Sequence, residues 1–195
     1  FITKGETAHM LAAIKDRALA LVKGRSYEQM NAMISDVYEQ NIRAKVWPET
    51  ARIAQQHIEA GREVWIITAA PQEMGNEIAK RLGLTGALGT KLKQIDGVLT
   101  GELEGKPLHG KQKAKAIKKL AKEKGISLKR SFAYSDSHND LPMLSLVGHP
   151  VAVNPDKMLK AYAKAAGWKI YDFKRKELRP TKKAIKREIK IDKRG

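Results

Sequence analysis

The spacing of the hydrophobic residues in this 195-residue chain changes near residue 62. Before that point, apolar residues recur at helical intervals in three segments, 6–22, 26–42 and 47–61. Ser26 is a suitable N-cap for the second segment, and Pro48 and Gly61 suit the first turn and the end of the third. The pattern therefore predicts an all-helical N-terminal third.

After residue 62, short apolar runs alternate with helical segments. The predicted strands are 63–68, 131–135, 149–153 and 168–173, and the predicted helices are 71–84, 110–125, one from about residue 139 and one opening at 154–155. Segment 86–103 predicts a β-hairpin with Asp96-Gly97 at its turn. Strands alternating with helices are typical of an α/β fold, with a Rossmann-like parallel sheet between two layers of helices.

The change of pattern also suggests how the chain is divided. We expect residues 1–46 to form a helical cap, 47–173 to form the α/β core, and 174–195 to form a basic tail. The tail has few large apolar residues and does not continue the alternation of strands and helices.

The charge and composition of the chain limit the kinds of function that it can have. The net charge of +17 comes mostly from residues 111–130 and 174–195, and such basic segments favour anionic partners. A basic module that binds nucleic acid or an acidic membrane is therefore an alternative function, although no nucleic-acid motif occurs. The absence of cysteine excludes disulfides and thiolate metal sites and fits a cytoplasmic protein, and no apolar run is long enough to span a membrane.

A dense polar cluster, Ser-Asp-Ser-His-Asn-Asp, directly follows the predicted strand 131–135. Ligands of α/β sheets bind beyond the carboxyl ends of the strands, where Thr68 also stands at the end of the strand 63–68. Asp136 and Asp140 repel each other unless a cation lies between them, and oxygen ligands suit Mg²⁺. The alternative is that both carboxylates only cap the following helix.

Three stretches and their order resemble the haloacid dehalogenase superfamily, in particular its phosphoserine-phosphatase-like branch. "VWIITAAP" is similar to the second motif of the family, "GKQKAKAI" to the segment that carries its lysine, and "SDSHND" to its metal-binding motif. The resemblance covers residues 61–173, well over half of the chain. Each motif is weak alone, but their order and spacing together are specific.

The resemblance implies an Mg²⁺-dependent phosphatase that hydrolyses a small phosphomonoester through an aspartyl-phosphate intermediate. Thr68, followed by Ala69, matches the position whose hydroxyl holds the phosphate. Lys113 is the best match to the lysine that offsets the charge of the phosphate, and Lys111 is the alternative.

Asp136 matches the metal ligand of the family, while Asn139 and Asp140 match its supporting polar pair. Glu6 lies where phosphoserine phosphatases place a glutamate that meets the substrate amine. The cap arginine of those enzymes has no counterpart in "SYEQMNAMISDVYEQN", so the resemblance leaves the identity of the substrate open.

The sequence departs from the family in its first motif. The nucleophile of the family comes from a D-x-D-x-T motif on the first strand, and these 195 residues contain no such motif. "FITKGET" resembles the segment that directly follows that motif. We therefore expect that the chain, as given, lacks the nucleophile and does not turn over substrate by the family mechanism, either as a truncated form or as an inactive one.

Overall fold

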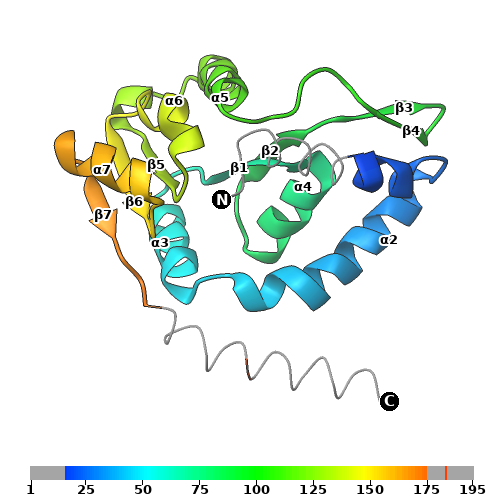
Figure 1. Ribbon diagram of the computed structural model, residues 1–195, viewed down its shortest axis with the longest axis horizontal. Helices are drawn as coiled ribbons and strands as arrows, with labels where there is room; N and C mark the ends of the chain where they lie inside the picture. The colour runs from blue at the N-terminus through cyan, green and yellow to red at the C-terminus, as the bar shows by residue number, and fades with distance from the viewer. Residues whose placement is uncertain (1–15, 175–182, 184–195) are drawn as a thin grey trace, which may run out of the picture.

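The computed structural model of the protein describes residues 16–174 and residue 183 (Figure 1). Glu6, the predicted contact of the substrate amine, lies outside these residues. Almost all of the predicted basic tail, 174–195, lies outside them too.

The first part of the described chain is helical, as the spacing of its apolar residues predicts. Residues 16–22 are helical, and α2 (Tyr27–Val37), the π-helical turn η1 (Tyr38–Ile42), the 3-10 turn η2 (Arg43–Lys45) and α3 (Pro48–Glu59) follow. Ser26 is the N-cap of α2, and it exchanges hydrogen bonds with Gln29 in a capping box. Gly61 follows α3 at φ 72°, a left-handed conformation that glycine adopts without strain.

The strands of the α/β part form two parallel groups. β1 (Trp65–Pro71) pairs with β2 (Gly86–Thr90), and α4 (Gln72–Arg81) connects them. β5 (Phe132–Ser135), β6 (His149–Val153) and β7 (Lys169–Tyr171) pair in that order. Parallel strands joined by helices are what the alternating pattern predicts.

The predicted hairpin over 86–103 is wrong in its first part. Gly86–Thr90 is a parallel strand against β1, with Gly86 opposite Trp65. A Cβ atom at Gly86 would lie 2.7 Å from the Trp65 ring, so the small residues of this run allow a large ring of β1 to cross them. The hairpin itself comprises β3 (Leu92–Ile95) and β4 (Val98–Leu103), and it turns at the predicted Asp96-Gly97, both at positive φ.

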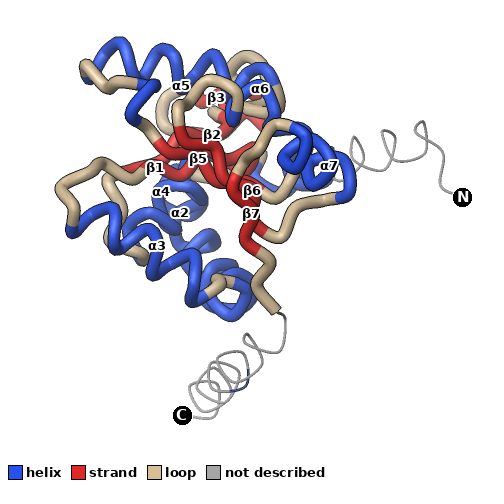
Figure 2. The backbone as a smooth tube through the Cα atoms, turned by 90° about the vertical axis from the view of Figure 1, so that its left-hand side faces the viewer, coloured by secondary structure: helices blue, strands red, loops and turns tan. Residues whose placement is uncertain are grey.

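Helices lie on both sides of the strands (Figure 2). The remaining ones are α5 (Lys111–Lys124), the 3-10 turns η3 (Leu128–Arg130) and η4 (His138–Asp140), α6 (Leu141–Leu144) and α7 (Lys157–Ala165). The helix predicted from about residue 139 is therefore only a 3-10 turn followed by a four-residue helix. In the described part of the chain, no helix is long and apolar enough to cross a bilayer.

Two clusters of buried side chains hold these elements together. The larger one comprises Met143, Leu144, Ala152, Leu159 and Ala163, and Ile67 of β1 packs against it. Because Ile67 belongs to the first group of strands and Ala152 to the second, this cluster joins the two groups.

The second cluster lies between α2 and the hairpin. Met30 and Ile34 of α2 pack with Leu92 and Leu99 of the two hairpin strands, and Met74 of α4 packs against them. The division into a cap, 1–46, and a core, 47–173, stays a prediction. The hairpin lies within the predicted core range but packs against α2.

Among the described residues, both outer strands of each group have an unpaired edge: β1 and β2 in the first group, and β5 and β7 in the second. Within the described residues, β1 pairs only with β2, and β5 pairs only with β6. The backbone N–H and C=O groups of these two edges are therefore available to a further strand.

The buried side chain of Leu159 gives a direct test of the larger cluster. Leu159 is completely buried, so replacing it with alanine removes packed methyl groups and leaves a cavity. We expect Leu159→Ala to lower the free energy of unfolding by about 2–5 kcal/mol in urea titrations. The adjacent Met158 is 64% exposed, so Met158→Ala should change it by less than about 0.5 kcal/mol. Equal losses for the two variants would contradict this assignment of the core.

Candidate active site

The hydrogen-bonded ladder of β1 is interrupted at Thr68. Ile67 pairs with Leu88, but the next pairing is between Pro71 and Thr90, so the register shifts across residues 68–70. At this break, the Thr68 hydroxyl oxygen accepts a hydrogen bond from the Ala70 N–H at 3.1 Å. The two predicted phosphate-holding residues, Thr68 and Ala69, therefore lie in an irregular segment, 68–70, in the second half of β1.

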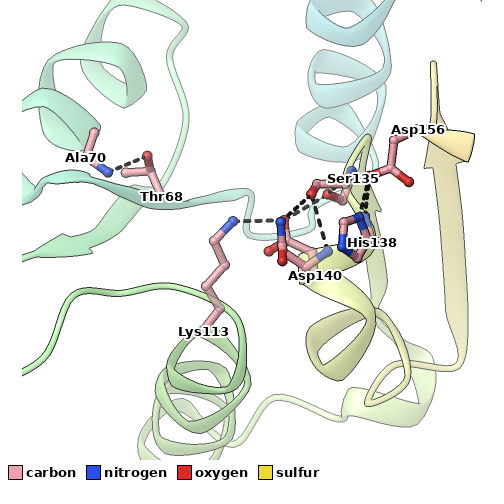
Figure 3. A network of polar contacts seen from close by, with 9 residues as sticks. Thr68, Ala70, Lys113, Ser135, His138, Asp140 and Asp156 are labelled. Atoms are coloured by element: carbon pink, nitrogen blue, oxygen red, sulfur yellow. Dashed lines mark hydrogen bonds and ion pairs between the residues drawn. The ribbon is translucent and has the colours of Figure 1, made fainter. Parts of the chain in front are cut away.

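A buried group of polar side chains forms at the end of β5. Lys113 Nζ lies 2.8 Å from Asp140 Oδ2, and the Ser135 hydroxyl donates to the same oxygen at 2.8 Å (Figure 3). The Lys113 and Asp140 side chains are only 12% and 9% exposed. Asp140 is therefore held by two donors that come from two different elements, α5 and β5.

The structure distinguishes Lys113 from the other lysines of α5. Lys113 is partly buried and turned toward Asp140, whereas Lys111, the alternative, is exposed, as are the remaining lysines of the helix. Lys113 is thus the lysine of α5 that is brought to the polar cluster. Its catalytic role remains a prediction.

Asp136 and Asn139 lie on the exposed side of the same turn. Within residues 16–174, the Asp136 carboxylate takes part in no hydrogen bond or ion pair, while its backbone carbonyl accepts from Asp156 N–H at 2.8 Å. The Asn139 side chain donates to Ser137 Oγ at 3.2 Å. Asp136 is therefore the carboxylate of this turn that is left for a ligand, because Asp140 is occupied by Lys113 and Ser135.

The exposed carboxylate at this turn is an oxygen ligand of the kind that Mg²⁺ takes. No group of three or more His, Cys, Asp or Glu side chains capable of holding a metal ion occurs among the described residues. Mg²⁺ is commonly bound by one or two carboxylates and completes its octahedral shell with water and phosphate oxygens. The exposed Asp136 carboxylate meets that requirement.

The sequence reasoning did not assign a role to Ser135 or to the pair formed by His138 and Asp156. Asp156 Oδ2 accepts from both the backbone N–H and Nδ1 of His138, each at 2.8 Å, and Oδ1 caps α7 by accepting from Leu159 N–H at 2.8 Å. An aspartate three residues before a helical apolar residue is an N-cap signal that could have identified Asp156. Its link to His138 depends on the tertiary structure.

Hydrogen bonding to Asp156 favours its ionised form. Partial burial by itself raises the pKa of this carboxyl group, but the hydrogen bonds from Leu159 and His138 outweigh it and lower the pKa to about 2. Asp156 thus remains negatively charged at neutral pH and ties the turn after β5 to the start of α7.

This lowered pKa predicts a dependence of stability on pH. Because the pKa falls on folding from 3.8 to about 2, the stabilisation by ionised Asp156 is complete above about pH 4 and is lost as the pH falls toward 2. In urea unfolding, Asp156→Asn should therefore be less stable than the wild type at pH 6, and the difference should shrink between pH 4 and 2. A difference that stays constant down to pH 2 would show that the carboxylate charge does not matter.

The ion pair between Lys113 and Asp140 predicts a coupled loss of stability. Lys113→Met leaves a buried carboxylate without its cation, so we expect a loss of about 3–5 kcal/mol in the free energy of unfolding. Adding Asp140→Asn should restore part of that loss, because the carboxylate charge is then gone. Lys111→Met, at an exposed lysine of the same helix, is the matched control and should have little effect. Additive effects of the two substitutions would argue against a direct ion pair.

Comparison with known proteins places this geometry in a family. The model of the haloacid dehalogenase-like hydrolase family matches residues 4–145. "Phosphoserine phosphatase SerB1" of Mycobacterium tuberculosis is 48% identical over 169 residues, which are 87% of this chain and 55% of that protein. The chain thus spans about half the length of that curated relative.

Solved structures show the same fold. A protein of unknown function from Bordetella pertussis Tohama I has a TM-score of 0.74 at 28% identity, covering 81% of this chain and 72% of that one. The "phospho-aspartyl intermediate analogue of phosphoserine phosphatase" has a TM-score of 0.57 at 25% identity, covering 82% and 70%. Together with the family model and the parallel strands flanked by helices, these similarities show that the chain belongs to the haloacid dehalogenase-like hydrolase family.

Proposed function

We propose that this chain supplies most of the active site of an Mg²⁺-dependent phosphatase, which hydrolyses a small phosphomonoester through an aspartyl-phosphate intermediate. The observation that carries the proposal is the arrangement at the end of β5. There, Asp140, which forms a buried ion pair with Lys113 of α5, lies in the same short turn as the Asp136 carboxylate, which has no partner within residues 16–174. The relatives named as phosphoserine phosphatases support this assignment.

Thr68 is suited to hold a phosphate oxygen. Its hydroxyl oxygen already accepts from Ala70 N–H, so the hydroxyl hydrogen is left to be donated to a ligand. A hydroxyl donor that is held in one position lowers the free energy of the charged transition state, because it does not have to reorganise at the moment of reaction.

Lys113 provides the positive charge of the site. One of its three N–H donors is directed to Asp140, and the other two are available for a phosphate oxygen or for the attacking carboxylate. Its burial strengthens these interactions because little water screens them. Asp140 and Ser135 act by holding the ammonium group in place.

Asp136 would bind the Mg²⁺ ion, with Asn139 on the same exposed side of the turn. When bound, the ion supplies positive charge that neutralises the phosphoryl oxygens and the attacking carboxylate. Asp136 itself is positioned by its backbone carbonyl, which accepts from Asp156 N–H.

The nucleophile of this mechanism is an aspartate of a D-x-D-x-T motif, which the 195 residues do not contain. We infer that the strand carrying it pairs between β1 and β5, because both are edge strands in the described part of the molecule, and Ile67 of β1 and Ala133 of β5 pack against the same buried cluster. At that position, the aspartate would lie between Thr68 and Asp136. An attack on phosphorus would then displace the alcohol, and water would release the phosphate from the aspartate.

The proposal predicts activity only when the first strand is present. The chain extended at its N-terminus by a strand that carries a D-x-D-x-T motif should hydrolyse phosphomonoesters in the presence of Mg²⁺, and EDTA should abolish this activity. In the extended chain, Asp136→Asn and Thr68→Val should each lower kcat/KM at least about 100-fold, because each removes a group that meets the phosphate or its metal ion. A screen with phosphoserine and other small phosphomonoesters measures both effects.

Lys111→Met is the control for that screen, since Lys111 is exposed on the same helix as Lys113 and should retain activity. Activity that survives both EDTA and Asp136→Asn would overturn the proposed mechanism. An extended chain that hydrolyses nothing but binds polyanions, with affinity falling steeply as salt rises, would favour the charge-based alternative instead.

A further inference from the structure

We propose that Thr90 is a positioning residue that couples the irregular, phosphate-holding segment 68–70 of β1 to the helix that carries Lys113. The proposal rests on the proposed function for its catalytic meaning, but the coupling itself is a property of the fold. Neither the polar cluster after β5 nor the family motifs in the sequence include Thr90. It is the last residue of β2, and its side chain is only 5% exposed.

A single hydroxyl group joins two segments that the site needs. Thr90 Oγ1 donates to the Ala69 carbonyl oxygen at 2.7 Å and accepts from the Leu108 N–H at 3.0 Å. Ala69 follows Thr68 in the irregular segment of β1, and Leu108 lies three residues before the start of α5. The Thr90 hydroxyl therefore bridges the two segments, because it donates to one and accepts from the other.

The break in the β1 ladder explains why a side chain makes this bond. The register shifts between Ile67 and Pro71, so Ala69 has no paired residue on β2. Its carbonyl oxygen accepts from the Thr90 hydroxyl instead. Without that donor, a part-buried hydrogen bond at a phosphate-holding residue would be lost, which costs free energy.

Gln72 and Gly89 hold the end of β2 close to the segment of the chain that follows Thr68. Gln72 Oε1 accepts from Gly89 N–H at 2.8 Å, and Gln72 Nε2 donates to the Ala87 carbonyl at 2.9 Å. A Cβ atom at Gly89 would lie 2.6 Å from Gln72 Cα, so only glycine permits this approach. The end of β2 is thus a rigid support from which Thr90 reaches both segments.

The other contact of Thr90 bears on the position of Lys113. Between Leu108 and α5 the chain turns at once, with Gln112 N–H donating to the His109 carbonyl and Lys113 N–H to that of Gly110. Because Lys113 lies in the first turn of α5, a shift of the segment at Leu108 moves its ammonium group relative to Thr68. Misplacing a catalytic group by about 1 Å can cost about 100-fold in rate.

The coupling is tested in the 195-residue chain by hydrogen–deuterium exchange. Thr90→Val keeps the shape of the side chain but removes the hydroxyl, so exchange should become at least about tenfold faster in both 68–71 and 104–110. Thr90→Ser keeps the hydroxyl and should exchange like the wild type. Thr100→Val is the matched control, because Thr100 also makes two hydrogen bonds through its hydroxyl, but in the hairpin.

The catalytic meaning is tested by titration with inorganic phosphate in the presence of Mg²⁺, followed by the NMR shifts of the Ala69 and Ala70 amides. We expect Thr90→Val to bind phosphate about tenfold more weakly and Thr90→Ser to bind it like the wild type. In the chain extended by the first strand, Thr90→Val should lower kcat while Thr100→Val should not.

Faster exchange in only one of the two segments, or in neither, would overturn the coupling. Faster exchange in both with unchanged phosphate affinity and kcat would overturn the positioning role and leave Thr90 a structural residue. If the wild type binds no phosphate and the extended chain is inactive, the proposed function fails, and the exchange experiment still decides the coupling. Should Thr90→Val not fold, Leu108→Pro removes the N–H donor of the bridge while leaving Thr90 in place, and it should speed exchange in both segments.

Discussion

The buried ion pair between Lys113 and Asp140 is the interaction on which the candidate site depends. The two residues are 27 positions apart, and each is placed by its own element: Lys113 by the first turn of α5 and Asp140 by the 3-10 turn after β5. Taking both charges out of water is costly, so the pair is stable only if its geometry is good and its remaining lone pairs are satisfied. Ser135 supplies that second contact, because its hydroxyl donates to the same oxygen of Asp140.

Around this ion pair the strands and helices are short or interrupted, and side-chain hydrogen bonds hold the backbone there in place of regular secondary structure. β1 loses its ladder at Thr68, β5 ends at Ser135, and α6 is only four residues long. Asp156 holds the turn after β5 through His138 and caps α7. Such irregular backbone exposes donors and acceptors to a ligand, but it keeps one conformation only if side chains bind it from several directions.

Much of the fold could be predicted from the sequence, because it depends on local spacing. Ser26 capping α2, Gly61 ending α3 and the Asp96-Gly97 turn are each decided within a few residues. The run at Gly86–Thr90 was misread as part of a hairpin, because its small residues match a turn-flanking strand as well as a buried parallel one. Which of the two it becomes depends on the Trp65 ring that crosses Gly86, and that contact is 21 positions away in the sequence.

By itself, the sequence determined the α/β class, the polar turn after β5 and the spacing that singles out Lys113, since these depend on periodicity and on the order of motifs along the chain. Only the tertiary structure decided that Asp140 is taken by Lys113 and Ser135, so that Asp136 is the carboxylate left for a ligand. Only it revealed that Thr90 bridges Ala69 and Leu108. The reason is physical: the energy of a hydrogen bond or ion pair depends on distance, direction and burial, and these quantities are set when elements far apart in the sequence pack together.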